Sequence, residues 1–360
     1  MSPSDAGVFL ALGMTCAFPA KLKLIRSVFG PLPSAVIMRF LMKDTHTPLL
    51  ADELAVPIAS HFRPNYHQCS CFQKTRWWFA HALTRWPHAT YYAKTEDDTF
   101  IHMGKLLQDL SRPELISNDR LLYGLLNTCN EGQGRYIGDF EGSVGLRGRI
   151  LEHVIKGLPF PTGPLAVFSR RLAQETFGSC AYTAALRGPN ISGQRCMRTA
   201  VMNSSLRHSC DCAIGIALNH CVRGRITAAH MTWTKGHHFD LGAGGKGWVR
   251  PGPETVTVHG NHLKKRKRMP WMVARNETHF WSNRTSFPPI LWSVVYSGST
   301  PKVLLLNRSL QMWYLKACIR PTHPPPVPGG VRWSWQTPTQ NFGCHYARGY
   351  DIPVYADEKP

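Results

Sequence analysis

Apolar and polar residues alternate along the first hundred residues in segments of strand and helix length. The run at residues 7–18 is apolar and predicts a first buried strand, and the segment after it predicts a helix that carries Arg26. A second apolar run at residues 35–42 is rich in strand-forming side chains, and the polar stretch 43–48 ends it. The chain therefore opens with a strand, a helix and a second strand.

The next segment has the period of a helix. Four apolar side chains recur at spacings of seven, four and three, which fits one helix face: Phe72, Phe79, Leu83 and Trp86. Pro87 ends that helix, and residues 89–93 predict another buried strand. Strands and helices in this order predict βαβ units, and so an α/β fold with a mostly parallel central sheet flanked by helices.

Three carboxylates, Glu96, Asp97 and Asp98, follow that strand directly. Acidic side chains so close together repel one another, and a divalent cation is a partner that neutralises them. A polar turn that caps the next helix is the alternative. Because ligands of largely parallel sheets bind at the carboxyl ends of the strands, the position favours a functional site.

The length and composition are those of a globular protein. The 360 residues suit one large domain or two ordinary ones, and a content of 43% hydrophobic and 18% charged residues is typical of a globular protein.

The net charge indicates which classes of partner to expect. Lys and Arg exceed Asp and Glu by 42 − 22 = 20, so an anionic partner is expected, such as nucleic acid, an acidic glycan, a membrane surface or a nucleotide. The basic run at 264–268 could be a nuclear-localisation tract or a polyanion patch, but a solvated loop is the simplest interpretation.

Cysteines and glycosylation sequons favour an oxidising compartment with some disulfides. There are eleven cysteines, and sequons occur at Asn190, Asn203, Asn276, Asn283 and Asn307. The C-x-C pairs at 69/71 and 210/212 are too tight for the usual zinc knuckle. No segment reaches the ~18 to 20 unbroken apolar residues of a membrane span, and the first apolar run lacks the basic residues that precede a signal-peptide core.

Five short segments follow one another in a recognisable order. They are Leu24–Phe29 (LIRSVF), Lys94–Phe100 (KTEDDTF), Phe160–Ser169 (FPTGPLAVFS), Asp211–Gly215 (DCAIG) and Thr255–Gly260 (TVTVHG). Together they resemble the motifs of the β-1,3-galactosyltransferase and fringe-like family of inverting glycosyltransferases, above all its K-x-D-D-D-x-F signature. The similarity covers residues 7–268, and it implies a GT-A-type nucleotide-diphospho-sugar transferase fold.

The resemblance also implies a reaction. A hexose would pass from a UDP-sugar to a hydroxyl of an acceptor glycan with inversion, forming a β-1,3 linkage, as in galactosyl- or N-acetylglucosaminyltransferases. Mn²⁺ or Mg²⁺ would bridge the diphosphate through hard oxygen ligands. Asp98 would be the direct metal ligand and His259 the distal one, while Glu96 and Asp97 would face the ribose or the metal's waters.

The alternatives at the metal site concern histidines and one carboxylate. His230, His237 and His238 compete with His259, which could instead be a hydrogen-bonded histidine at a strand end. Glu96 stands where the family usually has Asp. Its side chain is longer by one methylene, so its carboxylate lies at a different position from that of the family's Asp.

Asp211 aligns with the family's general base. It is the only acid between Glu175 and Asp240, and a displacement at the anomeric carbon needs one carboxylate to take the acceptor's proton. The alternative is an N-cap of the helix that follows. Cys210 stands where the family often has a second acid, and this departure weakens the case for activity.

Three further positions carry weaker expectations. Arg26 and Lys74 stand where the family contacts the nucleotide or diphosphate, and exposed helix positions are the alternative. Gly163 would let the sugar approach the backbone closely, and a turn between Pro161 and Pro164 is the alternative.

Beyond residue 270 the resemblance stops. We expect a catalytic domain over residues 1–270 and a C-terminal extension of unknown role over residues 271–360, with a proline-rich linker near 320–330. By resemblance, the protein works in the Golgi lumen or secretory pathway, with membrane association only through an anchor missing from this chain. The expected partners are a UDP-hexose and an acceptor glycan on a glycoprotein, proteoglycan or glycolipid.

Two other classes of function compete with this one. A catalytically weak lectin-like or scaffold relative is motivated by Cys210 and Glu96. A basic polyanion-binding or nucleic-acid-binding protein is motivated by the net charge, but no nucleic-acid-binding module accompanies that charge, so no nucleic acid is expected.

Overall fold

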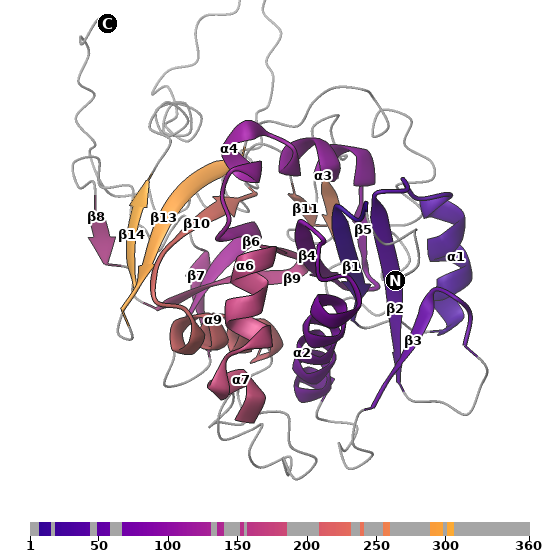
Figure 1. The fold of residues 1–360 in the computed structure, drawn as a ribbon, viewed down its shortest axis with the longest axis horizontal. Coiled ribbons are helices and arrows are strands. Elements are labelled where there is room, and N and C mark those ends of the chain that lie inside the picture. Colours follow the sequence, from indigo (N-terminus) through magenta and orange to yellow (C-terminus); the bar gives the residue numbers. More distant parts are fainter. Residues whose placement is uncertain are drawn as a thin grey trace, which may run out of the picture.

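The protein is a three-layer α/β structure in which a large sheet lies between two sets of helices (Figure 1). The computed structural model describes residues 7–15, 19–43, 49–57, 67–130, 135–139, 152–154, 157–185, 209–231, 238–240, 255–259, 289–297 and 301–305. The five sequons, the basic run and the proline-rich stretch lie outside these residues.

The large sheet has eleven strands in the order β3-β2-β1-β4-β9-β6-β10-β13-β14-β8, with β7 paired to β6. Their bounds are β1 (Leu10–Met14), β2 (Val36–Lys43), β3 (Glu53–Val56), β4 (Tyr91–Thr95), β6 (Leu121–Asn130), β7 (Arg135–Asp139), β8 (Glu152–Val154), β9 (Leu158–Ser169), β10 (Gly224–His230), β13 (Ile290–Tyr296) and β14 (Lys302–Leu305). Seven of the eleven run in one direction, namely β1, β2, β3, β4, β6, β10 and β14. The expectation of an α/β fold with a mostly parallel sheet is therefore confirmed.

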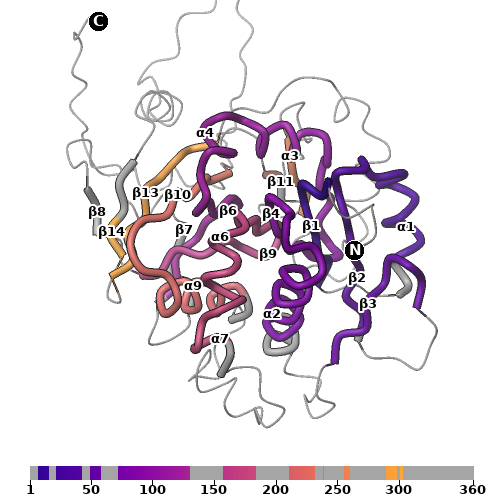
Figure 2. Tube along the Cα trace, viewed as in Figure 1, coloured from indigo at the N-terminus to yellow at the C-terminus, as the bar shows by residue number. Residues whose placement is uncertain are grey.

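Strand β9 is the main departure from a simple parallel sheet. It comes later in the chain than β4 and β6, yet it lies between them and is antiparallel to both (Figure 2). Its register places Leu165 opposite Thr95, which is the last residue of β4. The segment that begins β9 therefore reaches the carboxyl end of β4.

Helices cover both faces of the sheet (Figure 1). Their bounds are α1 (Pro19–Phe29), α2 (His67–Arg85), α3 (Met103–Leu110), α4 (Pro113–Ile116), α6 (Arg170–Ala173), the π-helix η3 (Gln174–Gly178), α7 (Ala181–Ala185) and α9 (Ser209–Cys221). Alternate strand residues enter two separate cores: on β1, Ala11 packs with α2, α6 and α9, whereas Leu10 and Leu12 pack with α1, α3 and α4. This alternation is the period of two that a strand buried on both faces must have.

The elements predicted for the first hundred residues are present. The run at 7–18 contains β1, and α1 follows this run. The run at 35–42 corresponds to β2, and the run at 89–93 overlaps β4. The predicted apolar face of α2 is also confirmed, because Phe72, Phe79 and Trp86 are buried in the core. Trp86 directly follows the last helical residue.

A second, small sheet stands beside the large one. It has three strands in the order β11-β12-β5, namely β11 (His238–Asp240), β12 (Thr257–His259) and β5 (Thr99–Ile101). Because β5 follows the acidic residues 96–98 at the end of β4, this sheet brings the late segment 257–259 to the same place.

Two strands lie beyond the domain boundary predicted at residue 270. Strand β13 is antiparallel to β10, and β14 is antiparallel to β13, so both extend the large sheet. Strand β13 is almost wholly buried, and its apolar side chains contribute to the core that contains α9. The boundary at residue 270 therefore does not separate these strands from the catalytic domain that was expected to end there.

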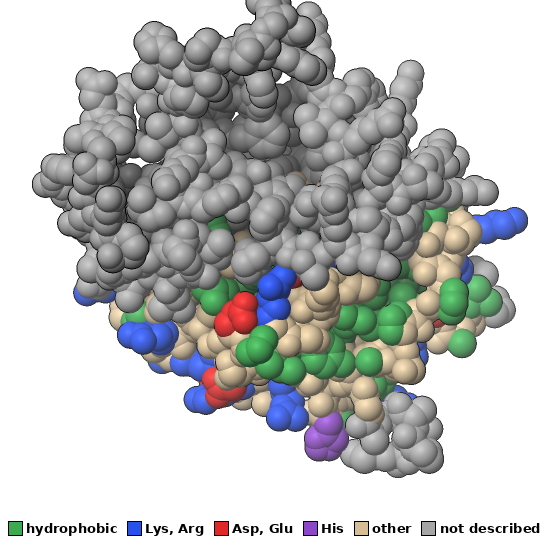
Figure 3. Space-filling view, turned by 90° about the horizontal axis from the view of Figure 1, so that it is seen from above, with side chains coloured by type: hydrophobic (Ala, Val, Ile, Leu, Met, Phe, Trp, Pro, Cys, Tyr) green, Lys and Arg blue, Asp and Glu red, His purple; other side chains and the backbone are tan. Residues whose placement is uncertain are grey.

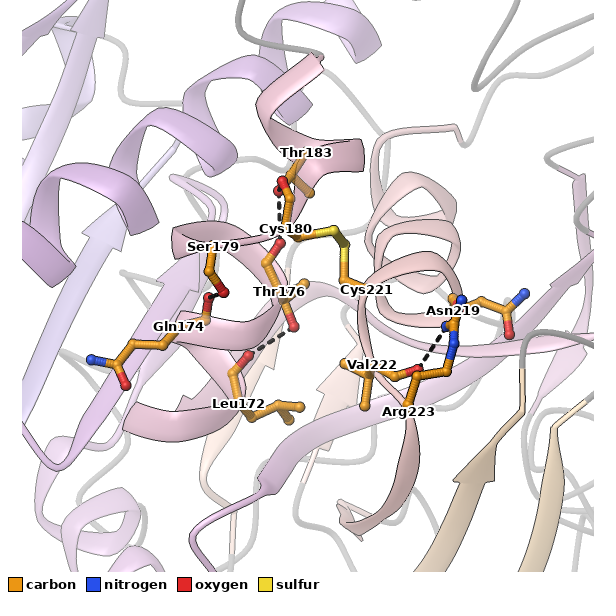
Figure 4. The surroundings of a disulfide bond; sticks show 10 residues. All are labelled: Leu172, Gln174, Thr176, Ser179, Cys180, Thr183, Asn219, Cys221, Val222 and Arg223. Atoms are coloured by element: carbon orange, nitrogen blue, oxygen red, sulfur yellow. Dashed lines mark hydrogen bonds between the residues drawn. A yellow bond between two sulfur atoms is a disulfide. The ribbon is translucent and has the colours of Figure 1, made fainter.

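One disulfide fixes the end of α9. Cys180, just after η3, is bonded to Cys221, the last residue of α9 (Figure 4). The expectation of at least some disulfides is confirmed. With the two cysteines 41 positions apart in the sequence, the chain-entropy account gives a stabilisation of about 4 kcal/mol. This bond anchors the helix whose first turn carries Asp211.

The described surface is of mixed character. On the face shown in Figure 3, basic side chains lie among acidic and apolar ones and do not merge into one continuous basic area. Among the described helices, none combines the length and the apolar character that a membrane crossing requires.

Candidate functional site

The acidic residues lie in a tight turn at the carboxyl end of β4, as predicted. Glu96 follows the last residue of β4, and its carbonyl oxygen accepts a 3.2 Å hydrogen bond from the N–H of Thr99, which begins β5. Asp97 and Asp98 occupy the turn between them. The turn therefore directs these side chains at the edge of the sheet where ligands of α/β proteins bind.

The end of β4 is held rigidly on three sides. From β1, the N–H of Thr15 donates a 2.8 Å hydrogen bond to the carbonyl of Thr95. From β4 itself, the hydroxyl of Thr95 donates to the carbonyl of Pro164 in β9 at 2.7 Å. From α2, the indole N–H of the buried Trp78 donates to the carbonyl of Ala93 at 2.8 Å.

His259 reaches the turn through the small sheet. In the pairing of β12 with β5, His259 stands opposite Thr99, one residue after Asp98. Its Nε2 lies 3.6 Å from Oδ1 of Asp98. The N–H of His102 donates to the carbonyl of Val256 at 2.8 Å and extends the same contact. Backbone pairing thus brings together two residues that are 161 positions apart.

Glu96, Asp98 and His259 form a candidate metal cluster. One donor atom from each lies within 4.8 Å of the other two. Oδ1 of Asp98 is buried and accepts no hydrogen bond, so a negatively charged oxygen lies in the cluster without the donor that such a group normally needs. Two carboxylate oxygens and one imidazole nitrogen suit Mn²⁺ well, and Mg²⁺ when phosphate and water supply further oxygen ligands. The residues present therefore fit the expected metal.

The competing histidines have other roles or positions. Nδ1 of His230 accepts a 3.0 Å hydrogen bond from the N–H of Leu126, where the register of β6 against β9 shifts. Nδ1 of His238 lies 2.7 Å from the hydroxyl of Thr257, and the His238 ring is 6.1 Å from that of His259. His237 lies outside the described residues. Of the histidines considered from the sequence, His259 is the one that joins Glu96 and Asp98 in the described cluster.

Asp211 lies across from this cluster, at the start of α9. It is the third residue of the helix, so the N-cap interpretation was wrong. Its carboxylate is directed at the sheet instead: Oδ1 lies 2.8 Å from Nζ of Lys94, and Oδ2 accepts a 2.7 Å hydrogen bond from the N–H of Gly163. Its side chain remains 22% exposed, so a ligand can reach it.

Lys94 joins the two parts of the site. Its side chain is fully buried in β4, and its Nζ lies 2.8 Å from Asp211 and 3.5 Å from Oε1 of Glu96. Burial raises the pKa of Glu96 from 4.5 to about 7; the charges of Asp211 and Asp98 add to the rise, while those of Lys94 and His259 oppose it. A carboxyl whose ionisation is opposed by burial and by neighbouring negative charge would be stabilised in its charged form by a cation.

Gly163 is required at its position by the space available. A Cβ atom there would lie 2.7 Å from Oε1 of Glu96, which is closer than such atoms approach. The described neighbour of Gly163 is Glu96, and a close approach of the sugar at this glycine stays a prediction. The glycine lies inside β9, so the alternative of a plain turn was wrong.

The remaining predicted residues make their described contacts elsewhere. The guanidinium of Arg26 is paired with Asp52 and Glu53, each at 2.7 Å. Nζ of Lys74 donates a 3.2 Å hydrogen bond to the carbonyl of Leu41. Asp97 is buried within the turn. Contacts of Arg26, Lys74 and Asp97 with a nucleotide stay predictions.

Lys94 is the site residue that the sequence prediction missed. A signal was present, because Lys94 stands between the apolar run at 89–93 and the acidic triplet. A lysine that continues a buried strand needs a negatively charged partner in the protein interior. Comparison of the sequence with models of protein families gave no match, and comparison with curated proteins gave none either.

Proposed function

We propose that this protein transfers a hexose from a UDP-sugar to a hydroxyl of an acceptor glycan, with inversion and with the help of Mn²⁺ or Mg²⁺, forming a β-1,3 linkage. The corresponding fold would be of the GT-A type. The secretory pathway is the proposed location, and the disulfide between Cys180 and Cys221 supports an oxidising compartment.

One observation carries the proposal. The motif resemblance selected Asp98 and His259 as ligands of one metal without any knowledge of their positions, and these residues lie 3.6 Å apart. It also selected Asp211 as the base, and this residue is linked to the same turn through Lys94. The proximity of these residues, which come from three distant segments, is what supports the proposal.

The chemistry assigns separate tasks to the two parts of the site. A divalent cation held by Asp98, His259 and Glu96 would supply positive charge for the departing diphosphate. Asp211 would accept the proton of the acceptor hydroxyl, since each of its carboxylate oxygens has a second lone pair beyond the one used by Lys94 or Gly163. The 22% exposure of Asp211 leaves room for that hydroxyl.

A lectin-like or scaffold relative is the second candidate. It is favoured by the fact that both oxygens of Asp211 already accept hydrogen bonds from the protein, one from Lys94 and one from Gly163. Such a protein would bind the same ligands without turnover.

A donor panel separates the two candidates. Release of UDP would be measured for UDP-galactose, UDP-glucose, UDP-N-acetylglucosamine and UDP-N-acetylgalactosamine, with and without β-linked acceptor sugars, in Mn²⁺ and in chelator. We expect metal-dependent release that rises with acceptor for one donor. Donor binding by calorimetry with no acceptor-dependent release would favour the lectin-like candidate, and no binding of any donor would overturn both.

A further inference from the structure

Lys94 is a fully buried cation placed between two carboxylates that the proposed function uses for different purposes. Its Nζ lies 2.8 Å from Oδ1 of Asp211, the proposed base, and 3.5 Å from Oε1 of Glu96, a member of the metal cluster. A buried ammonium group needs such partners, because an unpaired charge in the protein interior is strongly unfavourable. The two carboxylates thus share one ammonium group.

We infer that Lys94 is a positioning residue that couples the occupancy of the metal cluster to the orientation of Asp211. The inference rests on the proposed function and adds a regulation of the same site. Without a cation, the ammonium group is divided between Glu96 and Asp211. When a cation binds the oxygens of Glu96, its charge repels the ammonium group, which then moves away from Glu96 and toward Asp211.

The packing around Lys94 makes this coupling specific. Asp211 cannot follow the ammonium freely, because its other oxygen is held by the N–H of Gly163 at 2.7 Å. The carboxylate of Glu96 occupies the space beside Gly163 that a Cβ would fill, so it packs against the same glycine that holds Asp211. With both carboxylates restrained, the ammonium group is the part that moves between them.

Charge determines the direction of the expected effects. Lys94 and the cation compete for Glu96, so removing the ammonium group should strengthen cation binding. Removing the charge of Asp211 should weaken cation binding, although Asp211 is not a member of the metal cluster, because Lys94 then turns to Glu96. A lysine that only supported the fold would give the opposite result on its removal, with a looser site and weaker binding.

The test is calorimetric titration with Mn²⁺ alone, on the full chain and without any sugar nucleotide. For charges about 5 Å apart at an effective dielectric constant near 20, Lys94→Met should tighten Mn²⁺ binding by ~10-fold or more, and Asp211→Asn should weaken it by a similar factor. In the Lys94→Met background, Asp211→Asn should have a much smaller effect, because the group that transmits it is gone. Lys302→Met, which removes a charge at the exposed lysine that begins β14, is the matched control and should leave the affinity unchanged.

Each outcome decides between the possibilities. Weaker or unchanged binding in folded Lys94→Met, or additive effects in the double variant, would overturn the inference while the proposed metal site stands. If Lys94→Met does not fold, Asp211→Asn still decides, since unchanged or tighter Mn²⁺ binding in that variant overturns the inference. A wild-type protein that takes up no Mn²⁺ would overturn the proposed function, and the inference with it.

Discussion

The N–H of Gly163 donates a 2.7 Å hydrogen bond to Oδ2 of Asp211, while the Cα of the same glycine faces the carboxylate of Glu96. One residue of β9 therefore touches both the proposed base and a member of the metal cluster. The carboxylate of Glu96 occupies the space left by the missing side chain, and this packing is open to a direct test.

Substitution of Gly163 by Ala should disturb the metal cluster first. The added methyl group would lie 2.7 Å from Oε1 of Glu96, so that carboxylate must move. We expect Mn²⁺ affinity to fall by ~10-fold and the free energy of unfolding to fall by ~1–3 kcal/mol. Calorimetry and urea denaturation measure these two effects. Gly104→Ala in α3 is the matched control, because a Cβ there meets only ordinary contacts, and unchanged Mn²⁺ binding in Gly163→Ala would contradict the geometry.

Asp98→Asn should abolish Mn²⁺ binding with little effect on the fold. Oδ1 of Asp98 accepts no hydrogen bond, so loss of its charge removes no such bond from that atom, and the metal-free protein should change in stability by less than ~1 kcal/mol. Calorimetric titration with Mn²⁺ measures the first effect and thermal denaturation in chelator the second. Asp119→Asn, at an exposed aspartate paired with Arg171, serves as control. Normal Mn²⁺ binding by Asp98→Asn would remove Asp98 from the site.

His259→Ala should lower the affinity for Mn²⁺, whereas His230→Ala should lower the free energy of unfolding. Loss of His259 should weaken Mn²⁺ binding by ~10-fold or more, because a ligand of the cluster is gone. Loss of His230 should leave the affinity intact but lower the free energy of unfolding by ~1–3 kcal/mol, because the N–H of Leu126 loses its acceptor in the sheet. Titration with Mn²⁺ and urea denaturation of both variants compare the two. The reverse profile would place the ligand on His230.

Asp211→Asn should separate catalysis from binding. At saturating Mn²⁺ and UDP-sugar, turnover should fall by about 10² to 10⁴, because an amide cannot accept the acceptor's proton, while KM for the donor changes by only a few-fold. Asn can still accept the hydrogen bond from Gly163, but it leaves buried Lys94 with a neutral partner, so stability should fall by ~1–3 kcal/mol. UDP release measures turnover, with Asp119→Asn as control. Turnover near that of the wild type would mean that the base lies elsewhere.

Stability of the metal-free protein should depend on pH through Glu96. Its pKa in the folded protein is about 7, above the ordinary 4.5, so the folded state binds more protons than the unfolded state between these values. The contribution of Glu96 is therefore most favourable below pH 4.5 and is lost as the pH rises through 7. Relative to the wild type, Glu96→Gln should gain on the order of 1–3 kcal/mol across this window. Urea denaturation in chelator at a series of pH values measures this difference in the free energy of unfolding. If the wild type and Glu96→Gln show the same dependence of stability on pH, the raised pKa of Glu96 is refuted.

Local patterns were sufficient to predict the first half of the sheet. Apolar runs bounded by polar or proline residues located β1, β2 and β4, because strands buried on both faces leave a continuous apolar signature. The insertion of β9 between β4 and β6 was not predictable in this way, since periodicity within a segment carries no information on which strands pair. The same reason explains why β13 and β14 were assigned to an extension.

The candidate site was predictable in its members but not in its connections. Short motifs selected Asp98 and His259, which the fold brings 3.6 Å apart, and Asp211, which contacts Lys94; their roles in the reaction stay proposals. The role of Lys94 depends on two distances from one atom, and only the folded chain brings Asp211 within 2.8 Å of it. The same holds for Gly163, whose neighbour proved to be Glu96.

The order of the strands has a consequence for how the protein acquires its activity during synthesis. Strand β9 must insert between two strands made earlier, and β12 supplies His259 only after most of the chain has been translated. Such long-range pairings are slow to form, because the loops that they close are long. A nascent chain that ends before β12 would carry the acidic turn without its histidine. On the proposed function, cation binding would therefore be a late event in maturation, and the proposed activity would await the closure of the small sheet.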